Sequence, residues 1–452
     1  MQSISSHKPN GLIFHVLSLA LPMAWSRFIQ MMGWFVGMLM VAHLGKEELA
    51  ASALINATQI TCCVIFMSLL FAIGVVAGRL FGEEKPYELG TLFQQSFIFS
   101  IIIGAVLSVV FYFIGDLLKL TGQSPQFTKI SSEYFHVFAW VGIPLMLLVC
   151  VQQFCYGILK QHLVIVNNIF SLIILIPILY LFIFGKFGFP ALKIRGLAVG
   201  IIIQSVINLI SLLISLHYLP DVKKYRFFEW RQLKGVHYVR QLFQVGWPMS
   251  IQFGGELLAF FVMTLFTGWL GEAALSASQI TFQVMLLFLI PLFAVAESAG
   301  ILVSQAIGSR QWHVVERTGR VCIRIGLVAV LLLSILFFAI PNYLSAMYIN
   351  IHDSANAQTV MLARWLFYLT ALSLLGDTLR NLYVGALRGF YDTQYPMWLG
   401  LITLWLIAVP LSYVMGFSLE WGVIGIRMAA IIAFFIGALL LWMRWRSRIA
   451  AL

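Results

Sequence analysis

Apolar runs of about 20 residues recur along the whole chain, and they limit its fold more than any other feature. Each run is long enough to cross about 30 Å of hydrocarbon as a helix. Inside lipid the backbone must satisfy its own hydrogen bonds, so such a run must be helical. The 452 residues are 61% hydrophobic and 10% charged, with a mean hydropathy of +0.95, whereas soluble domains carry about 25% charged residues. The sequence therefore predicts an all-α, polytopic protein of the lipid bilayer.

Polar breaks between the apolar runs divide the chain into twelve predicted membrane spans. The breaks include GEEKP at 82–86 and TGQSP at 121–125. The predicted spans cover about residues 12–40, 50–80, 88–115, 130–158, 163–186, 194–219, 241–269, 275–306, 319–345, 357–388, 394–417 and 420–444. The longest link, 221–240, contains DVKKYRFFEWRQLKG and is typical of an amphipathic segment at the membrane surface.

The second half of the chain repeats the first at an offset of 226 residues. The stretch from Pro22 to Ser52 aligns without a gap with the stretch from Pro248 to Ser278, sharing a proline start and an LG…L.AS turn. An even number of spans in each half gives both copies the same orientation. The sequence therefore predicts a parallel repeat of two six-helix lobes, residues 1–220 and 241–452, joined by the linker 221–240. In transporters of this kind, alternating access is a rocking of the lobes.

Basic residues indicate how the chain is oriented in the membrane. With the predicted spans, eighteen of the 28 Lys and Arg residues lie on the side of the N-terminus and seven on the other. The positive-inside rule then places both termini in the cytoplasm. The net charge of +11 is explained by these loops, so we expect no nucleic acid partner. We expect a monomer in the cell inner membrane.

Carboxylates inside apolar spans are the strongest functional signal, because a charge at the bilayer centre costs about 2.5–3.5 kcal/mol on insertion scales. The acids well inside spans are Glu256, Glu297 and Asp377, all in the second half. No basic residue lies within one helical turn of Glu256, so its sequence neighbourhood describes a lone carboxylate. On that view Glu256→Gln keeps the fold, holds or raises stability, and abolishes any ion-coupled activity.

Two of these acids have informative neighbours. Arg380 follows Asp377 by three residues, a spacing at which an ion pair forms easily on one helical face. The alternative is that Arg380 extends toward the headgroups and never meets Asp377. Glu297 lies among small residues that let helices approach closely. Its sequence leaves a packed and a cavity-facing glutamate equally open.

The segment GDTLRNLYVGALRGFYDTQYPM at 376–397 resembles the tenth-helix signature of the multidrug and toxic compound extrusion (MATE) family. The PM…LG…AA.S opening of both halves and the length of twelve helices are also similar to that family. The resemblance implies an efflux transporter that exports organic cations and drugs in exchange for Na⁺ or H⁺. It also implies that Glu256 and Asp377 correspond to acids that line a cation site in the second lobe of NorM-like members.

The first lobe departs from the family pattern. Many bacterial members have an aspartate on the first helix where this chain has Gly37. Their Asn-x-Pro-x-Asn pattern on the fifth helix corresponds here to Leu175-Ile176-Pro177-Ile178-Leu179. The resemblance therefore implies that a cation or proton site is missing from the first lobe. Coupling would then be concentrated in the second.

These observations predict a secondary-active exporter of small organic, often cationic, substrates by antiport with Na⁺ or H⁺. The expected cation and substrate site comprises Glu256, Asp377, Glu297, Arg380, Gln252 and Ser373, with Glu256 and Asp377 as candidate Na⁺ ligands. No other cofactor is expected. The chain has no Walker A, HExxH or DDxxD motif, so an enzyme is not indicated. The alternatives are a lipid-linked oligosaccharide or glycolipid flippase, which would need a basic cavity, and a non-transporting receptor or scaffold.

Overall fold

The computed structural model describes residues 9–122, 124–227 and 235–452, and these residues form an all-helical structure without strands. Twelve helices among them are long and apolar enough to cross a membrane, as the sequence predicts. Contacts divide the chain into two compact units, Trp25–Ser250 and Met1–Ala24 with Ile251–Leu452. These contact boundaries lie inside α1 (Pro9–Ala42) and α8 (His237–Trp269), whereas the sequence places the lobe boundary in the linker. The division into six-helix lobes stays a prediction.

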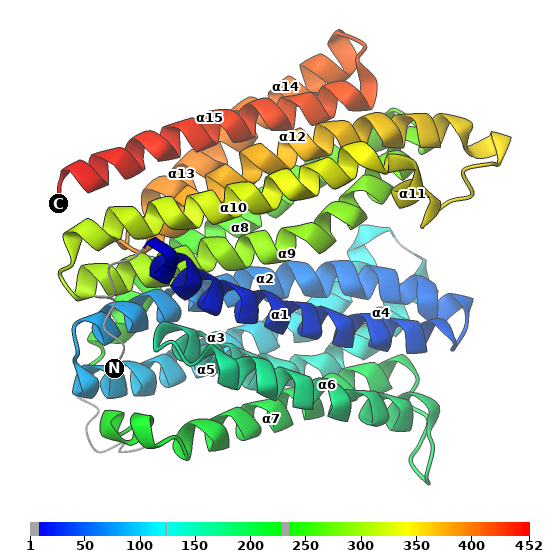
Figure 1. Ribbon diagram of the computed structural model, residues 1–452. Helices are drawn as coiled ribbons and strands as arrows, with labels where there is room; N and C mark the ends of the chain where they lie inside the picture. The colour runs from blue at the N-terminus through cyan, green and yellow to red at the C-terminus, as the bar shows by residue number, and fades with distance from the viewer. Residues whose placement is uncertain (1–8, 123, 228–234) are drawn as a thin grey trace. The chain divides into compact units, whose positions relative to one another are not determined.

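The unit Trp25–Ser250 contains most of α1, the first turns of α8 and the helices between them (Figure 1). Its fourth span consists of two helices joined by the short 3₁₀ segment Ala139–Val141. The intervening helices are α2 (Lys46–Gly82), α3 (Pro86–Leu117), α4 (Pro125–Phe138), α5 (Gly142–Gly157), α6 (Gln161–Phe184) and α7 (Ile194–His217).

The described parts of the linker are anchored to α3. The ring of Phe227 lies 4.9 Å from that of Phe93, and Gln94 donates a hydrogen bond to the Phe227 carbonyl at 3.3 Å. On the other side of the link, the Gln95 side chain accepts from the backbone N–H of Tyr238 at 2.9 Å. Residues 228–234 of the predicted amphipathic segment lie outside the described residues. Its first residues belong to the 3₁₀ helix Pro220–Tyr225.

The second unit contains the rest of α8 and the helices that follow it (Figure 1). Its helices are α9 (Glu272–Gly308), α10 (Trp312–Ala339), α11 (Pro341–Ala346), α12 (Ala357–Arg388), α13 (Gln394–Leu401), α14 (Val409–Tyr413) and α15 (Gly422–Ala450). Helices α2 and α9 have 37 residues each. The first and last residues of α9 lie at the predicted offset from those of α2. For the chain as a whole, the repeat stays a prediction.

The span Gln394–Ser418 is continued between α13 and α14 by a π-helical segment, Ile402–Ala408. Pro410 follows this segment, and proline cannot donate the backbone hydrogen bond that an α-helix needs four residues earlier. A wider turn accommodates that loss, and π-helical turns are frequent at functional sites. This segment contacts α15 and carries Trp405, whose indole N–H donates to the carbonyl of Gly255 on α8 at 3.1 Å.

Helices α9 and α12 approach each other more closely than side chains would allow. A Cβ atom placed on Gly385 of α12 would lie 1.9 Å from the carbonyl oxygen of Ala296 on α9. One placed on Gly389 would lie 2.6 Å from a methyl carbon of Val303. The small residues around Glu297 thus permit the close approach that the sequence predicts. This packing sets the position of α12 in its unit.

We therefore expect Gly385→Ala to lower the thermal stability of the purified protein in detergent, by about 1–3 kcal/mol, because overpacking forces a backbone shift. Gly268→Ala is the matched control, since a Cβ atom at Gly268 of α8 would meet nothing within 4 Å. The control should unfold at the wild-type temperature or slightly above it, because alanine restricts the unfolded chain. Fluorescence-detected size-exclusion chromatography after heating measures both variants. Equal unfolding temperatures for the two would contradict the proposed role of Gly385.

Candidate functional site

Arg380 is the largest fully buried side chain of the described structure, with a relative exposure of 1%. It projects from α12 and forms a forked ion pair with Glu256 of α8. The guanidinium nitrogens Nη1 and Nη2 lie 2.6 and 3.0 Å from Oε1 and Oε2 of Glu256. Two parallel N–H···O bonds of this kind are among the strongest polar contacts in proteins. Glu256 itself is 7% exposed, so the pair is shielded from water.

Arg380 also binds Asp377, one turn earlier on the same helix. Its Nη2 and Nε atoms lie 2.8 and 3.2 Å from Oδ1 of Asp377. The pairing predicted from the three-residue spacing is confirmed, and the alternative in which Arg380 extends to the headgroups is wrong. Arg380 Nη2 donates to both carboxylates, so one cation bridges two acids. We call Glu256, Asp377 and Arg380 the bridged triad.

The prediction of a lone carboxylate at Glu256 is wrong. Its partner lies 124 residues further along the chain, and no periodicity in the sequence of α8 could reveal it. The sequence did contain one signal that could have revealed this partner. Arg380 lies inside a predicted membrane span and has only one acid, Asp377, within a helical turn. Because a buried guanidinium has several donors to satisfy, Arg380 called for a second acceptor from another helix.

Neighbouring residues hold the triad in place. The side-chain amide of Gln252, one turn before Glu256, donates to Glu256 Oε1 at 2.9 Å. The Arg380 guanidinium lies 5.4 Å from the centre of the Phe434 ring of α15, within the range of a cation–π contact. A Cβ atom on Gly437 would lie 3.3 Å from Arg380 Cδ, so α15 is close enough there to restrict the arginine stem.

Two acids and one base leave the bridged triad with one excess negative charge when all three groups are ionised. Arg388, two turns after Arg380, is within electrostatic range of Glu256, Glu297 and Arg380. The ring of Phe253 lies beneath it, 5.5 Å from ring centre to guanidinium carbon. The triad, Glu297 and Arg388 therefore form one charged region in this unit. Sequence reasoning did not include Arg388 in the site.

The remaining predicted site residues lie near the triad but have different surroundings. Ser373 is buried on α12, one turn before Asp377, and among the described residues no hydrogen bond joins it to the triad. Glu297 is half-buried on α9. Its place in the region comes from its interaction with Arg388. Gln252 is the one predicted polar neighbour that contacts the triad directly.

The bridged triad already contains a cation at the place where Glu256 and Asp377 could share a metal ion. Hard metal cations take several oxygen ligands at once. Both oxygens of Glu256 and one of Asp377 accept hydrogen bonds from Arg380. In the part of the chain that the structure describes, no three or more His, Cys, Asp or Glu side chains gather to hold a metal. In this arrangement the Arg380 guanidinium lies between the two carboxylates, and their binding of Na⁺ stays a prediction.

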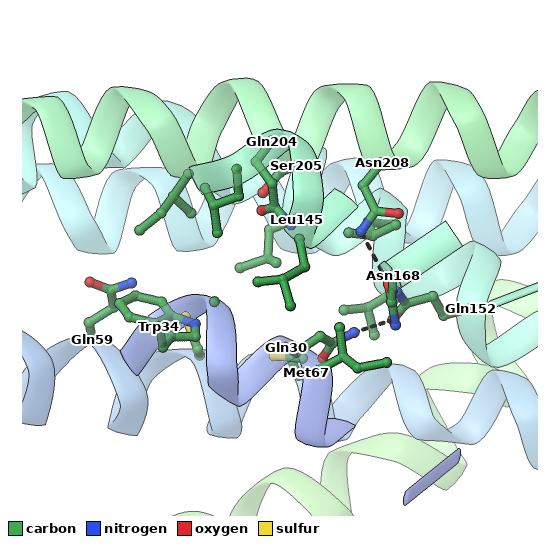
Figure 2. A pocket seen from close by; sticks show the side chains of 18 of the residues that line it. Gln30, Trp34, Gln59, Met67, Leu145, Gln152, Asn168, Gln204, Ser205 and Asn208 are labelled. Atoms are coloured by element: carbon green, nitrogen blue, oxygen red, sulfur yellow. Dashed lines mark hydrogen bonds between the residues drawn. The ribbon is translucent and has the colours of Figure 1, made fainter. Parts of the chain in front are cut away.

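The unit Trp25–Ser250 contains a pocket of a different character, with a volume of about 180 Å³. Its lining includes no Asp, Glu, Lys, Arg or His. Six side-chain amides, the Ser205 hydroxyl and mostly apolar residues form its walls (Figure 2). The amides are those of Gln30, Gln59, Gln152, Asn168, Gln204 and Asn208. Sequence reasoning missed this pocket, although amides at mid-span positions were visible as its signal.

The positions at which the family pattern has polar groups are occupied by apolar packing here. A Cβ atom on Gly37 would lie 2.7 Å from Leu197 Cδ1 and 3.5 Å from Leu179 Cδ1. Leu179 is fully buried and Leu175 is 4% exposed. An acid at residue 37 would therefore enter an apolar contact between helices.

Comparisons with known proteins agree with this architecture. The MatE family model matches residues 22–181 and 248–414. A probable multidrug resistance protein NorM of Xylella fastidiosa is 28% identical over 439 residues, covering 96% of this chain and 91% of that protein. The corresponding protein of a Synechococcus strain is 26% identical over 422 residues, covering 91% and 88%. The crystal structure of a MATE protein in its bent conformation superposes with a TM-score of 0.88 and 16% identity, covering 98% of this chain and 96% of that one.

The match to the family model includes both halves and covers most of the chain. The superposition supports the same fold. The chain belongs to the MatE family and is a multi-pass membrane transporter rather than an enzyme.

Proposed function

We propose that the chain is a secondary-active exporter of small organic, often cationic, molecules, driven by antiport with Na⁺ or H⁺. Membership of the MatE family and the names of the NorM relatives support the export of drugs. The observation that carries the coupling part of the proposal is the bridged triad, because ionisable groups inside a membrane protein mark ion pathways. By the charge counts above, we place both termini in the cytoplasm. We further propose that the chain is a monomer in the inner membrane.

The bridged triad can act as a switch because Arg380 has two acidic partners. An ion that binds one carboxylate weakens the hold of that carboxylate on Arg380, while the bond to the other partner remains. Glu256 lies on α8 and Arg380 on α12, so the loss of their fork changes what holds these helices together. A ligand can shift such an equilibrium only by its different affinity for the two arrangements. A cationic substrate would compete with the coupling ion for the excess negative charge.

Of the two coupling ions, this geometry favours the proton. A proton needs one carboxylate oxygen, and it can join Glu256 while Arg380 keeps its bonds to Asp377. A Na⁺ ion would have to displace the guanidinium from oxygens that it already contacts at 2.6–3.0 Å. The flippase alternative receives no support from the pocket in the other unit, because its lining lacks basic residues and a lipid phosphate is bound by such residues.

Inside-out membrane vesicles test the coupling proposal with ethidium as the cationic probe. With an acidic interior, vesicles that contain the wild-type protein should accumulate ethidium, and an outward-directed Na⁺ gradient at equal pH should drive far less uptake. Glu256→Gln should reduce pH-driven uptake at least tenfold at equal protein level, because a proton site is lost. Glu272→Gln, which changes an exposed acid at the start of α9, is the matched control and should retain uptake. Wild-type uptake by Glu256→Gln would refute the assignment of the site.

The stability of triad variants separates its structural role from its function. Removing one partner of a buried ion pair costs about 3–5 kcal/mol, whereas replacing every member by neutral groups is often neutral or stabilising. Arg380→Met alone should therefore lower the unfolding temperature strongly, and Glu256→Gln should lower it moderately rather than leave it unchanged. The triple variant Glu256→Gln/Asp377→Asn/Arg380→Met should recover most of the loss and still fail to couple transport to pH. Thermal unfolding in detergent measures whether the unfolding temperatures of these variants follow this order.

If the single and triple variants lose the same stability, the triad contributes no buried charge pairing. If the triple variant still exports ethidium in response to pH, coupling resides elsewhere.

A further inference from the structure

Asp392 lies in the turn between α12 and α13 and holds two arginines of α15 in place. Its Oδ2 atom accepts from Nε of Arg444 at 2.9 Å and from Nε of Arg448 at 2.7 Å. Nη2 of Arg444 lies 2.9 Å from the same oxygen. The Asp392 side chain is 6% exposed, whereas those of Arg444 and Arg448 are 32% and 40% exposed. A buried carboxylate thus positions two guanidinium groups that remain partly accessible. We call these three residues the arginine clamp.

The arginine clamp has one positive charge in excess, because two bases share one acid. Arg448 contacts Asp392 through Nε alone, so among the described residues its two Nη nitrogens have no hydrogen-bond partner. Arginine binds phosphate oxygens with the same forked geometry with which it binds carboxylates. Basic pockets between membrane helices bind lipid head groups in this way. The clamp therefore offers positioned donors and a charge that one phosphodiester anion would balance.

An exposed stripe of α13 leads from the arginine clamp along the membrane span. The ring centre of Tyr395, in the first turn of α13, lies 4.7 Å from the guanidinium carbon of Arg444. Helix α13 contacts α15 (Figure 1). Trp398 and Ile402 follow Tyr395 at helical spacing, so the three residues share one face. Trp398 is 58% and Ile402 is 45% exposed. We call Tyr395, Trp398 and Ile402 the α13 stripe.

The α13 stripe lies on the outer side of its unit. Gly400 faces inward, because a Cβ atom there would lie 3.6 Å from Oε1 of Glu256 in the bridged triad. Trp398 and Ile402 are each two residues from Gly400, and at about 3.6 residues per turn they point to the opposite side of the helix. The stripe therefore faces away from the triad, on the side where acyl chains surround a membrane span.

The arginine clamp and the α13 stripe together match the parts of a phospholipid. A water-soluble phosphate would use the clamp alone, whereas a phospholipid also covers the exposed apolar side chains. We propose that they bind one anionic phospholipid, with its phosphate at Arg444 and Arg448 and an acyl chain along Trp398 and Ile402. Phosphatidylcholine fits less well, because its cationic head group meets the excess positive charge of the clamp. The proposal uses only the membrane setting and does not depend on the substrate or on the coupling ion.

Native mass spectrometry of the full-length, delipidated protein in detergent tests the proposal. Offered equal amounts of phosphatidylglycerol and phosphatidylcholine, the protein should retain one phosphatidylglycerol most tightly. Arg448→Gln should weaken that binding about fivefold, the value of one basic residue beside an anionic lipid. Arg446→Gln is the matched control, because it removes the same charge from the same end of α15. The Arg446 guanidinium lies 5.4 Å from the Trp442 ring centre and outside the clamp, so its loss should leave the affinity nearly unchanged.

Two further measurements separate a bound lipid from general attraction of phosphate. Trp398→Asn leaves the clamp intact and should weaken phosphatidylglycerol binding, because the acyl chain loses an apolar contact. Glycerol 3-phosphate, which has the phosphate without the chains, should not displace the lipid at equal concentration. Equal losses in Arg448→Gln and Arg446→Gln, no preference for phosphatidylglycerol, unchanged binding by Trp398→Asn, or displacement by glycerol 3-phosphate would each overturn the proposal.

Discussion

The buried guanidinium of Arg380 is the interaction on which the organisation of the second unit depends. A charge of this kind is tolerated inside a membrane protein only when its donors are satisfied. Glu256 and Asp377 satisfy them from two helices, and Phe434 and Gly437 of a third helix enclose the rest of the side chain. The requirement to pair one cation therefore brings α8, α12 and α15 together at one depth.

The two units solve the problem of buried polarity in different ways. In one, full charges compensate each other, and the balance is sensitive to any ion or proton that joins a carboxylate. In the other, six neutral amides line a small pocket. Four of them share hydrogen bonds, those of Gln30, Gln152, Asn168 and Asn208, and a change of pH in the physiological range does not alter them. Gln30 occupies the repeat position that is Glu256 in the second half. At this equivalent position an amide belongs to the uncharged pocket of one unit, and a carboxylate belongs to the charged triad of the other.

The charged region also depends on close contact between the backbones of α9 and α12. Gly385 touches the carbonyl of Ala296 on α9, and Arg388 lies one turn beyond Gly385, where it is within electrostatic range of Glu297. In lipid, helix association relies on packing and interhelical hydrogen bonds rather than on exclusion of water. The glycines of α12 therefore determine how near the acids and bases of neighbouring helices lie.

The sequence by itself determined the class of fold, the number of spans and one half of the charged site. Apolar runs of helical length have one structural solution in lipid, and the Asp377–Arg380 pair follows from local helix geometry. Only the tertiary structure decided that Glu256 shares Arg380, that Arg388 belongs to the same region, and that the amides of five helices meet in a pocket. Two of these contacts join residues more than a hundred positions apart, Glu256 with Arg380 and Gln30 with Gln152. Such pairs leave no periodic signal along the chain, because helix packing and not the local backbone sets the distance between them.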